Sequence, residues 1–490
     1  MASLEPAPSI GSAGRSPAYR RLTDDQCRLL HDASLAILER TGVRLQLPEA
    51  VELLRRAGGS VEGDLVRIPA SLVDWALSVA PRELTLFDRA GEPAITCAGD
   101  AVAFGPGSDC LNILDHRTGE RRPARLADAV EGITLADALP SIDFVMSMFL
   151  PSDVDMRIAD RYQMEVMLGH TTKPIVLVTY EHDGMVDCLE MAAAVAGGFE
   201  ALARRPFVAT YINVTRALVG NEDSLRKLFF LAERGLPALW VPVTSGGTTG
   251  PVTTAGNLAL NNAGVLAGIV LAQLVREGTP LVVPGFGGDA LDLRTMVDPY
   301  AEPDHRGTVP ALAHWYGLPM FSLAGGSDAK VVDQQAAAEA ALTLLVDALG
   351  GGHLIHDSGY LESGLTGSLA HLAICDELIA WIRQAIAPIR IDEETLALDL
   401  IDEIGPGGEF MSHPETARRC RAEVWNPTLM DREPWINWQN AGARTMNDRI
   451  HAKVRKILST HRPPPLPEGA AEKIEAILRA AEAREAQRLA

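Results

Sequence analysis

The sequence predicts an α/β protein built on a TIM (β/α)8 barrel, with α-rich extensions on both sides of it. Short apolar segments recur roughly every 30–40 residues with helical stretches between most of them, which is the rhythm of βα units. Several begin with proline and end in small or polar residues, as strands entering a parallel sheet do. The predicted strands are 101–104, 142–150, 175–180, 207–212, 238–243, 281–284, 320–324 and 353–355.

Eight units within about 260 residues match the count and size of a closed barrel. An open doubly wound sheet is the alternative, but eight evenly spaced units favour closure. The barrel is expected over 98–372, and a polar hairpin over 109–123 interrupts its first unit.

The flanking regions are predicted in the same way. A disordered tail (1–20) precedes an α-rich extension (21–97), whose first helix starts at the capping box Thr23–Gln26. A helical region (373–460) follows the barrel, and 461–490 reads as a proline-rich linker with a narrowly amphipathic terminal helix. That helix packs either on the body or on a neighbouring subunit, and a homo-oligomer is expected.

Composition narrows the class of protein. A net charge of -20 argues against nucleic-acid and anionic-membrane partners. Six cysteines without a CxxC pair indicate a reducing cytoplasm rather than a disulfide framework. The first 20 residues lack the apolar core of a signal peptide, and no run of 18 apolar residues predicts a membrane span.

Known cofactor motifs are missing from the sequence. No P-loop, GxGxxG or GxSxG pattern appears, so the chain offers no nucleotide fingerprint and no nucleophile elbow. Its 12 histidines form no HxH, HExxH or Cys/His cluster, and no metal site is predicted.

The most informative stretch is 324–364, where two predicted strands end in polar residues. Asp328 and Lys330 lie in a glycine-bearing loop at the first of these ends, where parallel βα architectures keep their active sites. The alternative is that Ser327 or Asp328 caps the following helix while Lys330 is solvated.

His356, Asp357 and Tyr360 end the eighth strand. Successive strand residues point to opposite faces, so at most one of His356 and Asp357 is expected to face a ligand. The alternative for His356 is a buried ring hydrogen-bonded to the backbone.

Aromatic residues make up only 5% of the chain, so those at strand ends stand out. Tyr180, Phe286 and Tyr360 are candidate walls of a cation-binding cage, whereas Tyr211 and Trp240 lie deeper in their strands and read as core. Further polar candidates at strand ends are Glu181, which either neutralises a cation or sits on the rim, and Asn213.

Four segments together resemble the trimethylamine methyltransferase family. They are LTDDQCRLLHDASLAILERTGVRL at 22–45, GSDAKVVDQQAAAEAAL at 326–342, HLIHDSGYLESG at 353–364 and GPGGEF at 405–410. The resemblance runs from about 22 to 455 in the expected order. It implies a TIM barrel that moves a methyl group from a methylated amine to the cobalt of a separate corrinoid protein.

Two departures from the family pattern matter. The founding methylamine enzymes carry pyrrolysine, near the Ser327–Lys330 loop by our alignment, whereas every position here is an ordinary residue. Met411 also stands near His413 where a second histidine is expected. Since pyrrolysine is thought to activate small amines, its absence favours a quaternary amine of the glycine betaine type, which leaves as a neutral tertiary amine.

The resulting assignment gives catalytic roles to Asp328, His356 and Asp357. Substrate contacts are assigned to Tyr180, Glu181, Asn213, Phe286, Lys330 and Tyr360. The chain is expected to bind no cofactor itself, because it lacks the Asp-x-His-x-x-Gly string of cobalamin-binding modules. A corrinoid protein then docks over the barrel mouth, with 109–123 and 405–416 as rim elements. The alternatives are another methyl acceptor, such as a folate or a thiol, and a non-catalytic quaternary-amine-binding protein.

Overall fold

The computed structural model describes residues 18–287, 290–302 and 306–489. Its centre is a seven-stranded parallel sheet in the order β6-β15-β14-β13-β12-β10-β9. Every pair of neighbours is parallel, as βα units require. The strands are β6 (Ala103–Pro106), β9 (Ile175–Val178), β10 (Val208–Val214), β12 (Ala238–Pro242), β13 (Leu281–Pro284), β14 (Met320–Leu323) and β15 (Leu354–Ser358).

The predicted strand 142–150 is not a regular strand, yet it closes the barrel. Val145 forms an isolated parallel bridge with Ile175 of β9, and the Asp143 N–H donates to the Phe104 carbonyl of β6. Met148 has a φ of 59°, which interrupts an extended backbone. The segment therefore fills the gap between β6 and β9 and completes the TIM barrel.

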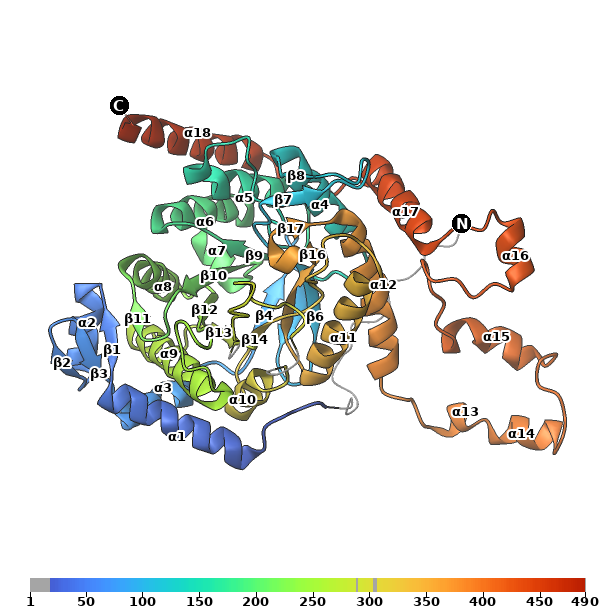
Figure 1. The fold of residues 1–490 in the computed structure, drawn as a ribbon, viewed down its shortest axis with the longest axis horizontal. Helices are drawn as coiled ribbons and strands as arrows, with labels where there is room; N and C mark the ends of the chain where they lie inside the picture. Colours follow the sequence, from blue (N-terminus) through green and yellow to red (C-terminus); the bar gives the residue numbers. More distant parts are fainter. Residues whose placement is uncertain (1–17, 288–289, 303–305, 490) are drawn as a thin grey trace.

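Helices surround the sheet on its outer side (Figure 1). They are α4 (Leu126–Ala138), η1 (Met156–Ile158), α5 (Ala159–His170), α6 (His182–Ala196), α7 (Phe199–Arg204), α8 (Glu222–Arg234), α9 (Thr254–Val275), α10 (Val309–Tyr316), α11 (Gln334–Gly350) and α12 (Leu369–Ile386). Helix α9 is long and apolar enough to cross a membrane, but 83% of its most apolar window is buried in the protein. It is a core helix of the barrel.

The N-terminal extension caps one side and one end of the barrel. The predicted capping box is present at Thr23 and Gln26, and α1 packs along α9. The extension's elements are α1 (Asp24–Arg40), β1 (Val43–Leu45), α2 (Pro48–Arg56), β2 (Ser60–Glu62), β3 (Leu65–Arg67), α3 (Ala70–Val79), β4 (Leu84–Phe87) and β5 (Pro93–Cys97), and β1 also pairs with β11 (Val219–Gly220).

The hairpin β4–β5 closes the amino-terminal end of the barrel. Leu86 and Ile95 belong to one buried cluster with the interior residues Val176, Leu239 and Phe321. Removing such side chains from water is the dominant favourable term in folding. Since this end is plugged, a ligand can reach the interior only from the carboxyl end of the strands.

A small sheet covers part of that carboxyl end. The predicted polar hairpin forms β7 (Asn112–Leu114) and β8 (Arg121–Pro123), with Gly119 at a φ of 75° in the turn. It joins β16 (Tyr360–Leu361) and β17 (Thr366–Gly367), which flank the short helix η2 (Glu362–Gly364).

The C-terminal part first leaves the barrel and then returns to it (Figure 1). Helices α13 (Glu393–Leu396), α14 (Leu398–Ile404), α15 (Pro414–Glu423) and α16 (Trp435–Asn440) stand away from the body. Next, α17 (Met446–Thr460) packs on α12 and α4, and α18 (Ala470–Leu489) packs on α6 and α5. The loop 405–416 lies between α14 and α15, so in a single chain it does not line the barrel mouth as expected.

Candidate active site

His356 and Asp357 meet at the carboxyl end of β15, and a bulge brings them together. The register of β15 on β6 shifts between Ile355 and Ser358, and Asp357 has a φ of 84°. Both side chains are buried, with His356 Nε2 3.3 Å from Asp357 Oδ1. A bulge cancels the strict alternation of a strand, so alternation does not decide which of the two side chains faces a ligand, and that expectation stays a prediction.

The surroundings of His356 hold the ring neutral. Its Nδ1–H donates to the Ser322 carbonyl at 2.6 Å, and the ring stacks on Phe321 with centroids 4.0 Å apart. Burial lowers the pKa of His356 to about 3, an effect that the Ser322 hydrogen bond only partly offsets. Nε2 is thus left as an acceptor toward Asp357.

Burial dominates the ionisation of Asp357. It raises the pKa of the carboxyl well above the usual value, and the nearby Tyr360 hydroxyl offsets this only in part. Gly107 makes the approach possible, because a Cβ there would lie 2.1 Å from the Tyr360 ring and 2.3 Å from Asp357 Oδ1. When protonated, Asp357 can donate its proton to His356 Nε2.

A second acid, the partly buried Asp109, lies near the first. Its Oδ1 accepts hydrogen bonds from Gln163 Nε2 at 2.8 Å and from Ser147 Oγ at 3.1 Å. Burial is again the main cause of a raised pKa, and Asp109 also has a positive φ, 60°. Asp357 and Asp109 both raise the pKa of Tyr360, so both carboxyl groups lie near this tyrosine. Non-glycine residues with a positive φ, such as Asp109 and Asp357, recur at functional sites.

Aromatic rings surround the His356–Asp357 pair. Phe286 lies 5.8 Å from the His356 ring, Tyr211 lies 5.6 Å from Phe321, and Tyr300 meets Tyr360 edge-on at 6.1 Å. Burial, and next the nearby Asp357 carboxyl, raise the pKa of Tyr211, so this tyrosine lies near Asp357 although its place in the strand predicted plain core.

A cavity of about 210 Å³ adjoins the aromatic wall, between β12, β13 and β14 and their loops. Phe286 and Tyr300 line it, as do Asp347 and Ser322. Among the described residues, the buried Tyr300 hydroxyl and Asp347 Oδ2 have no hydrogen-bond partner. A cavity below the roughly 300–1,000 Å³ of drug-sized pockets suits a small ligand.

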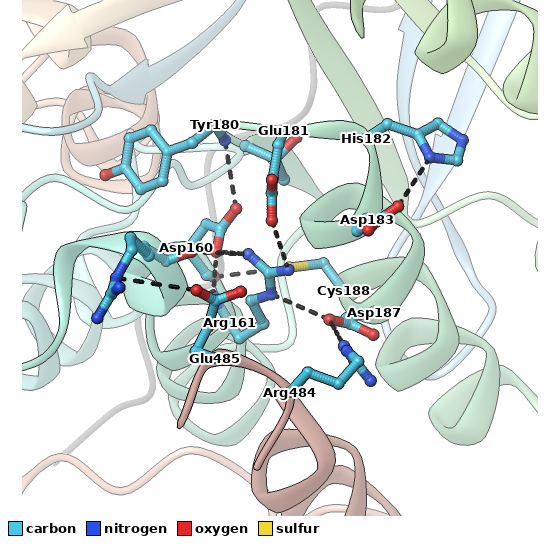
Figure 2. A network of polar contacts seen from close by, with 12 residues as sticks. Asp160, Arg161, Tyr180, Glu181, His182, Asp183, Asp187, Cys188, Arg484 and Glu485 are labelled. Atoms are coloured by element: carbon cyan, nitrogen blue, oxygen red, sulfur yellow. Dashed lines mark hydrogen bonds and ion pairs between the residues drawn. The ribbon is translucent and has the colours of Figure 1, made fainter. Parts of the chain in front are cut away.

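Tyr180 and Glu181, at the end of β9, are held by an ion-pair network (Figure 2). Asp160 Oδ2 accepts from the Tyr180 N–H at 3.2 Å, and Arg161, with 2% of its side chain exposed, pairs with Asp160 at 2.9 Å and Asp187 at 3.0 Å. Arg161 also lies 3.4 Å from Glu181. The Glu181 carboxylate is therefore already neutralised, which favours the rim interpretation over a cation-binding one.

Helix α18 belongs to the same network. Arg484 pairs with Asp187, and Arg488 lies 3.7 Å from Glu181. The C-terminal helix thus contacts the residues that fix the end of β9, and Tyr180 remains 41% exposed at the mouth. Burial raises the Tyr180 pKa, and the nearby carboxyls of Asp109 and Asp160 raise it further.

Asp328 organises the loop after β14. Its carboxylate accepts from the Tyr300 N–H at 2.9 Å and from Ser363 Oγ at 2.6 Å, and Lys330 is exposed, with Nζ donating to the Asp328 carbonyl. Neither Ser327 nor Asp328 caps α11: the loop runs on to Asp333, whose side chain accepts from the backbone of the first turn. The capping prediction was wrong, because the helix starts later than its apolar pattern indicates.

The structure brings some of the predicted residues together and leaves others apart. His356, Asp357, Tyr360 and Phe286 form one cluster; Tyr180 flanks it, Asp328 lies behind Tyr300, and Lys330 and Asn213 are exposed. Their roles stay predictions. Sequence reasoning missed Asp109, Gln163, Ser147 and Tyr300, since only the fold makes them neighbours. Within the described ranges, no group of three or more His, Cys, Asp or Glu side chains could hold a metal ion.

A closed barrel plugged at one end, with buried acids and aromatic rings at the other, defines a TIM-barrel enzyme that acts on a small molecule. The family model for Trimethylamine methyltransferase (MTTB) matches residues 5–485. The chain belongs to this family and is a methyltransferase.

Individual relatives are named as methyltransferases too. The trimethylamine methyltransferase MttB of Desulfitobacterium hafniense DCB-2 is 32% identical over 462 residues, covering 93% of this chain and 92% of that protein. The glycine betaine methyltransferase of strain Y51 is 31% identical over 455 residues, covering 92% and 94%. Among solved structures, the Methanosarcina barkeri monomethylamine methyltransferase (MtmB) aligns with a TM-score of 0.47 at 10% identity, covering 90% of this chain and 88% of that one.

Proposed function

We propose that the chain transfers a methyl group from a quaternary amine of the glycine betaine type to the Co(I) of a separate corrinoid protein. The observation that carries the proposal is a pair of acids with raised pKa, Asp109 and Asp357, among aromatic rings at the open end of the barrel. Relatives named for trimethylamine and for glycine betaine support an amine methyl donor.

Aromatic faces and ionisable acids suit a cation better than a neutral amine. Tyr360, Tyr180 and Phe286 would offer π-faces to the methylated nitrogen, each contact being worth about 0.5–2 kcal/mol. A permanent positive charge beside Asp357 stabilises its ionised form, so a proton leaves the acid when the cation enters. A quaternary substrate is therefore recognised by a charge that the empty site lacks.

The same acids fit the end of the reaction. When the methyl group is transferred, the electron pair of its C–N bond stays on nitrogen, and the amine becomes neutral. Asp357 then regains its proton, and the attraction that held the cation is lost. A quaternary donor needs no proton at the leaving nitrogen, which agrees with ordinary residues at every position of the Ser327–Lys330 loop.

A reduced corrinoid would supply a strong cobalt nucleophile. The chain's part is then to bind the amine, orient the methyl group toward the mouth and exclude water. Gly107 lets Asp357 and Tyr360 approach the strand end, and the β7–β8 hairpin supplies a rim on which the corrinoid protein can dock. The free thiols of all six cysteines suit a cytoplasmic site for this reaction.

Ligand binding tests the substrate class. A thermal-shift series of glycine betaine, carnitine, choline and trimethylamine should show stabilisation by quaternary ligands; saturation at 100 times the dissociation constant adds about 2.7 kcal/mol. Dimethylglycine, the demethylated control whose nitrogen carries no permanent charge, should shift the melting temperature less. Stabilisation by trimethylamine alone would contradict the quaternary assignment. Binding without methyl transfer to any corrinoid would favour the non-catalytic alternative.

A further inference from the structure

A long segment of the chain has almost no core of its own. We call residues 387–445, which link α12 to α17, the arm. It contains the helices α13 to α16, none of which has a buried residue. All positions from 387 to 449 are described, and only Leu429 among them is buried. Figure 1 shows the arm projecting from the barrel.

Helices this short are not stable by themselves. The arm's helices have 4, 7, 10 and 6 residues, whereas isolated helices below about 12–15 residues are marginal in water. Large apolar side chains on the arm are nevertheless exposed: Ile389 (85%), Ile391 (75%), Leu396 (50%), Leu398 (62%), Ile401 (49%), Phe410 (41%), Met411 (84%), Val424 (52%), Trp435 (70%) and Ile436 (60%). Large exposed apolar surface of this kind usually marks an interaction site.

The arm begins at the end of the barrel opposite the proposed corrinoid docking site. At the start of α12, the Ser368 N–H donates to the Gly359 carbonyl beside the candidate site. Near its end, Arg383 pairs with Asp143 and lies over the Phe104 ring at the start of β6. The arm therefore leaves from the plugged, amino-terminal end, opposite the mouth where a methyl acceptor must dock.

The exposed surface has the size of a stable interface. Burying an aliphatic or Phe side chain removes about 60–120 Å² from water, so ten partly exposed chains provide on the order of 600 Å². About 60% of an interface is apolar, which brings one arm to about 1,000 Å². A standard interface needs about 800 Å² per partner, and two arms exchanged about a twofold axis exceed it.

We propose that the arm is an exchange arm, packed on a second copy of this chain, which returns its own arm. A second copy is the one partner present wherever the chain itself is folded, and an arm needs cover from the moment it folds. The homo-oligomer expected from the sequence would thus be built at the plugged end of the barrel and leave both mouths open.

Sedimentation of the full-length chain tests the exchange. The triple substitution Ile389→Glu, Met411→Glu and Trp435→Glu places charges on the arm, whereas Val252→Glu, Leu293→Glu and Leu342→Glu places them on the barrel at sites 69%, 61% and 54% exposed. Wild type and the barrel control should sediment at twice 52.5 kDa or a higher multiple. The arm variant should sediment at 52.5 kDa with unchanged far-UV circular dichroism.

Two results would overturn the exchange: a wild-type monomer at micromolar concentration, or an arm variant that keeps the wild-type mass. If the triple variant misfolds, hydrogen exchange on the wild type decides. Arm amides should be protected in the assembled protein and lose protection on dilution in step with the mass, while barrel amides stay protected. Arm protection that persists in the monomer contradicts the proposal.

Discussion

At the scale of single residues, the account depends on acids that are neutral until a cation arrives. Asp357→Asn keeps the shape of the side chain but cannot ionise, so glycine betaine affinity should fall at least tenfold, about 1.4 kcal/mol. The melting temperature should stay level or rise, since the acid carries no charge in the empty site. Isothermal titration calorimetry measures the affinity.

The same titrations should show a pH dependence of known sign. The pKa of Asp357 is raised in the free protein, and the cation favours the ionised form; binding therefore releases a proton, and affinity rises with pH. Glu120→Gln, on the exposed β7–β8 hairpin, is the matched control and should change affinity less than twofold. If Asp357→Asn binds glycine betaine with an affinity within twofold of wild type, Asp357 has no role in recognising the cation.

Two substitutions of Tyr360 distinguish a role of its aromatic ring from a role of its hydroxyl group. Its hydroxyl donates to the Ser108 carbonyl, and its ring faces Tyr300. Tyr360→Phe keeps the π-face and should retain most of the affinity, whereas Tyr360→Ala should lose about 0.5–2 kcal/mol of binding and about 3–5 kcal/mol of stability. Lys330→Ala, at an exposed loop position, should leave both within about 0.5 kcal/mol. If Tyr360→Phe and Tyr360→Ala bind glycine betaine equally well, the Tyr360 ring has no role in binding and serves only the core.

At the scale of elements, the Arg161 network couples α18 to the end of β9, and one glycine tests its packing. A Cβ at Gly184 in α6 would lie 2.4 Å from Asp160 Oδ2 and 2.6 Å from Arg161 Nη1. Gly169 in α5 has nothing within 4 Å of the same position. In helix interiors, Gly→Ala normally stabilises by about 0.5–1 kcal/mol.

We therefore predict opposite signs for two identical substitutions. Gly169→Ala should raise the free energy of unfolding by up to about 1 kcal/mol. Gly184→Ala should lower it by about 1–3 kcal/mol, because the buried ion pair must shift to make room. Urea denaturation measures both. Stabilisation by Gly184→Ala would mean that Arg161 and Asp160 are loosely held and do not fix Tyr180.

Element boundaries also show what the sequence could and could not predict. Apolar runs located seven strands, because buried parallel strands are continuously apolar. The segment 142–150 is equally apolar, but the left-handed Met148 denies it regular pairing. The bulge that unites His356 and Asp357 leaves no signal in the residue pattern, and Asp109 looks like an ordinary turn residue until the fold places it near Tyr360.

At the scale of the whole molecule, buried histidines favour unfolding in mild acid. Burial lowers the pKa of His353 and His371 to about 4 and that of His356 to about 3, while the unfolded chain titrates near 6.5. Between these values the unfolded state binds more protons, so stability falls as pH falls. At pH 5 each histidine costs about 2 kcal/mol, or about 6 in all.

The buried Asp347 carboxyl has the opposite effect on the pH dependence of stability, and the effect is smaller. Burial raises the pKa of Asp347 to about 6, so lowering the pH from 7 to 5 relieves about 1 kcal/mol. The raised pKa values of Asp357 and Asp109 also favour the folded state as the pH falls. The histidine effect is therefore isolated with His371→Gln. Calorimetry at pH 7 and pH 5 should show a smaller acid-induced fall in melting temperature, or a larger rise, for this variant than for wild type; equal changes would contradict a neutral, buried His371.

The central claim is methyl transfer from a quaternary amine to a corrinoid, and one assay tests it most directly. The full-length chain is mixed with glycine betaine and a chemically reduced corrinoid, free or protein-bound; the visible spectrum follows methyl uptake by cobalt while mass spectrometry follows the amine. We predict one dimethylglycine per methyl group transferred, no product when either reactant is omitted, and strong loss of rate with Asp357→Asn. Steady demethylation of glycine betaine without any corrinoid would contradict the account.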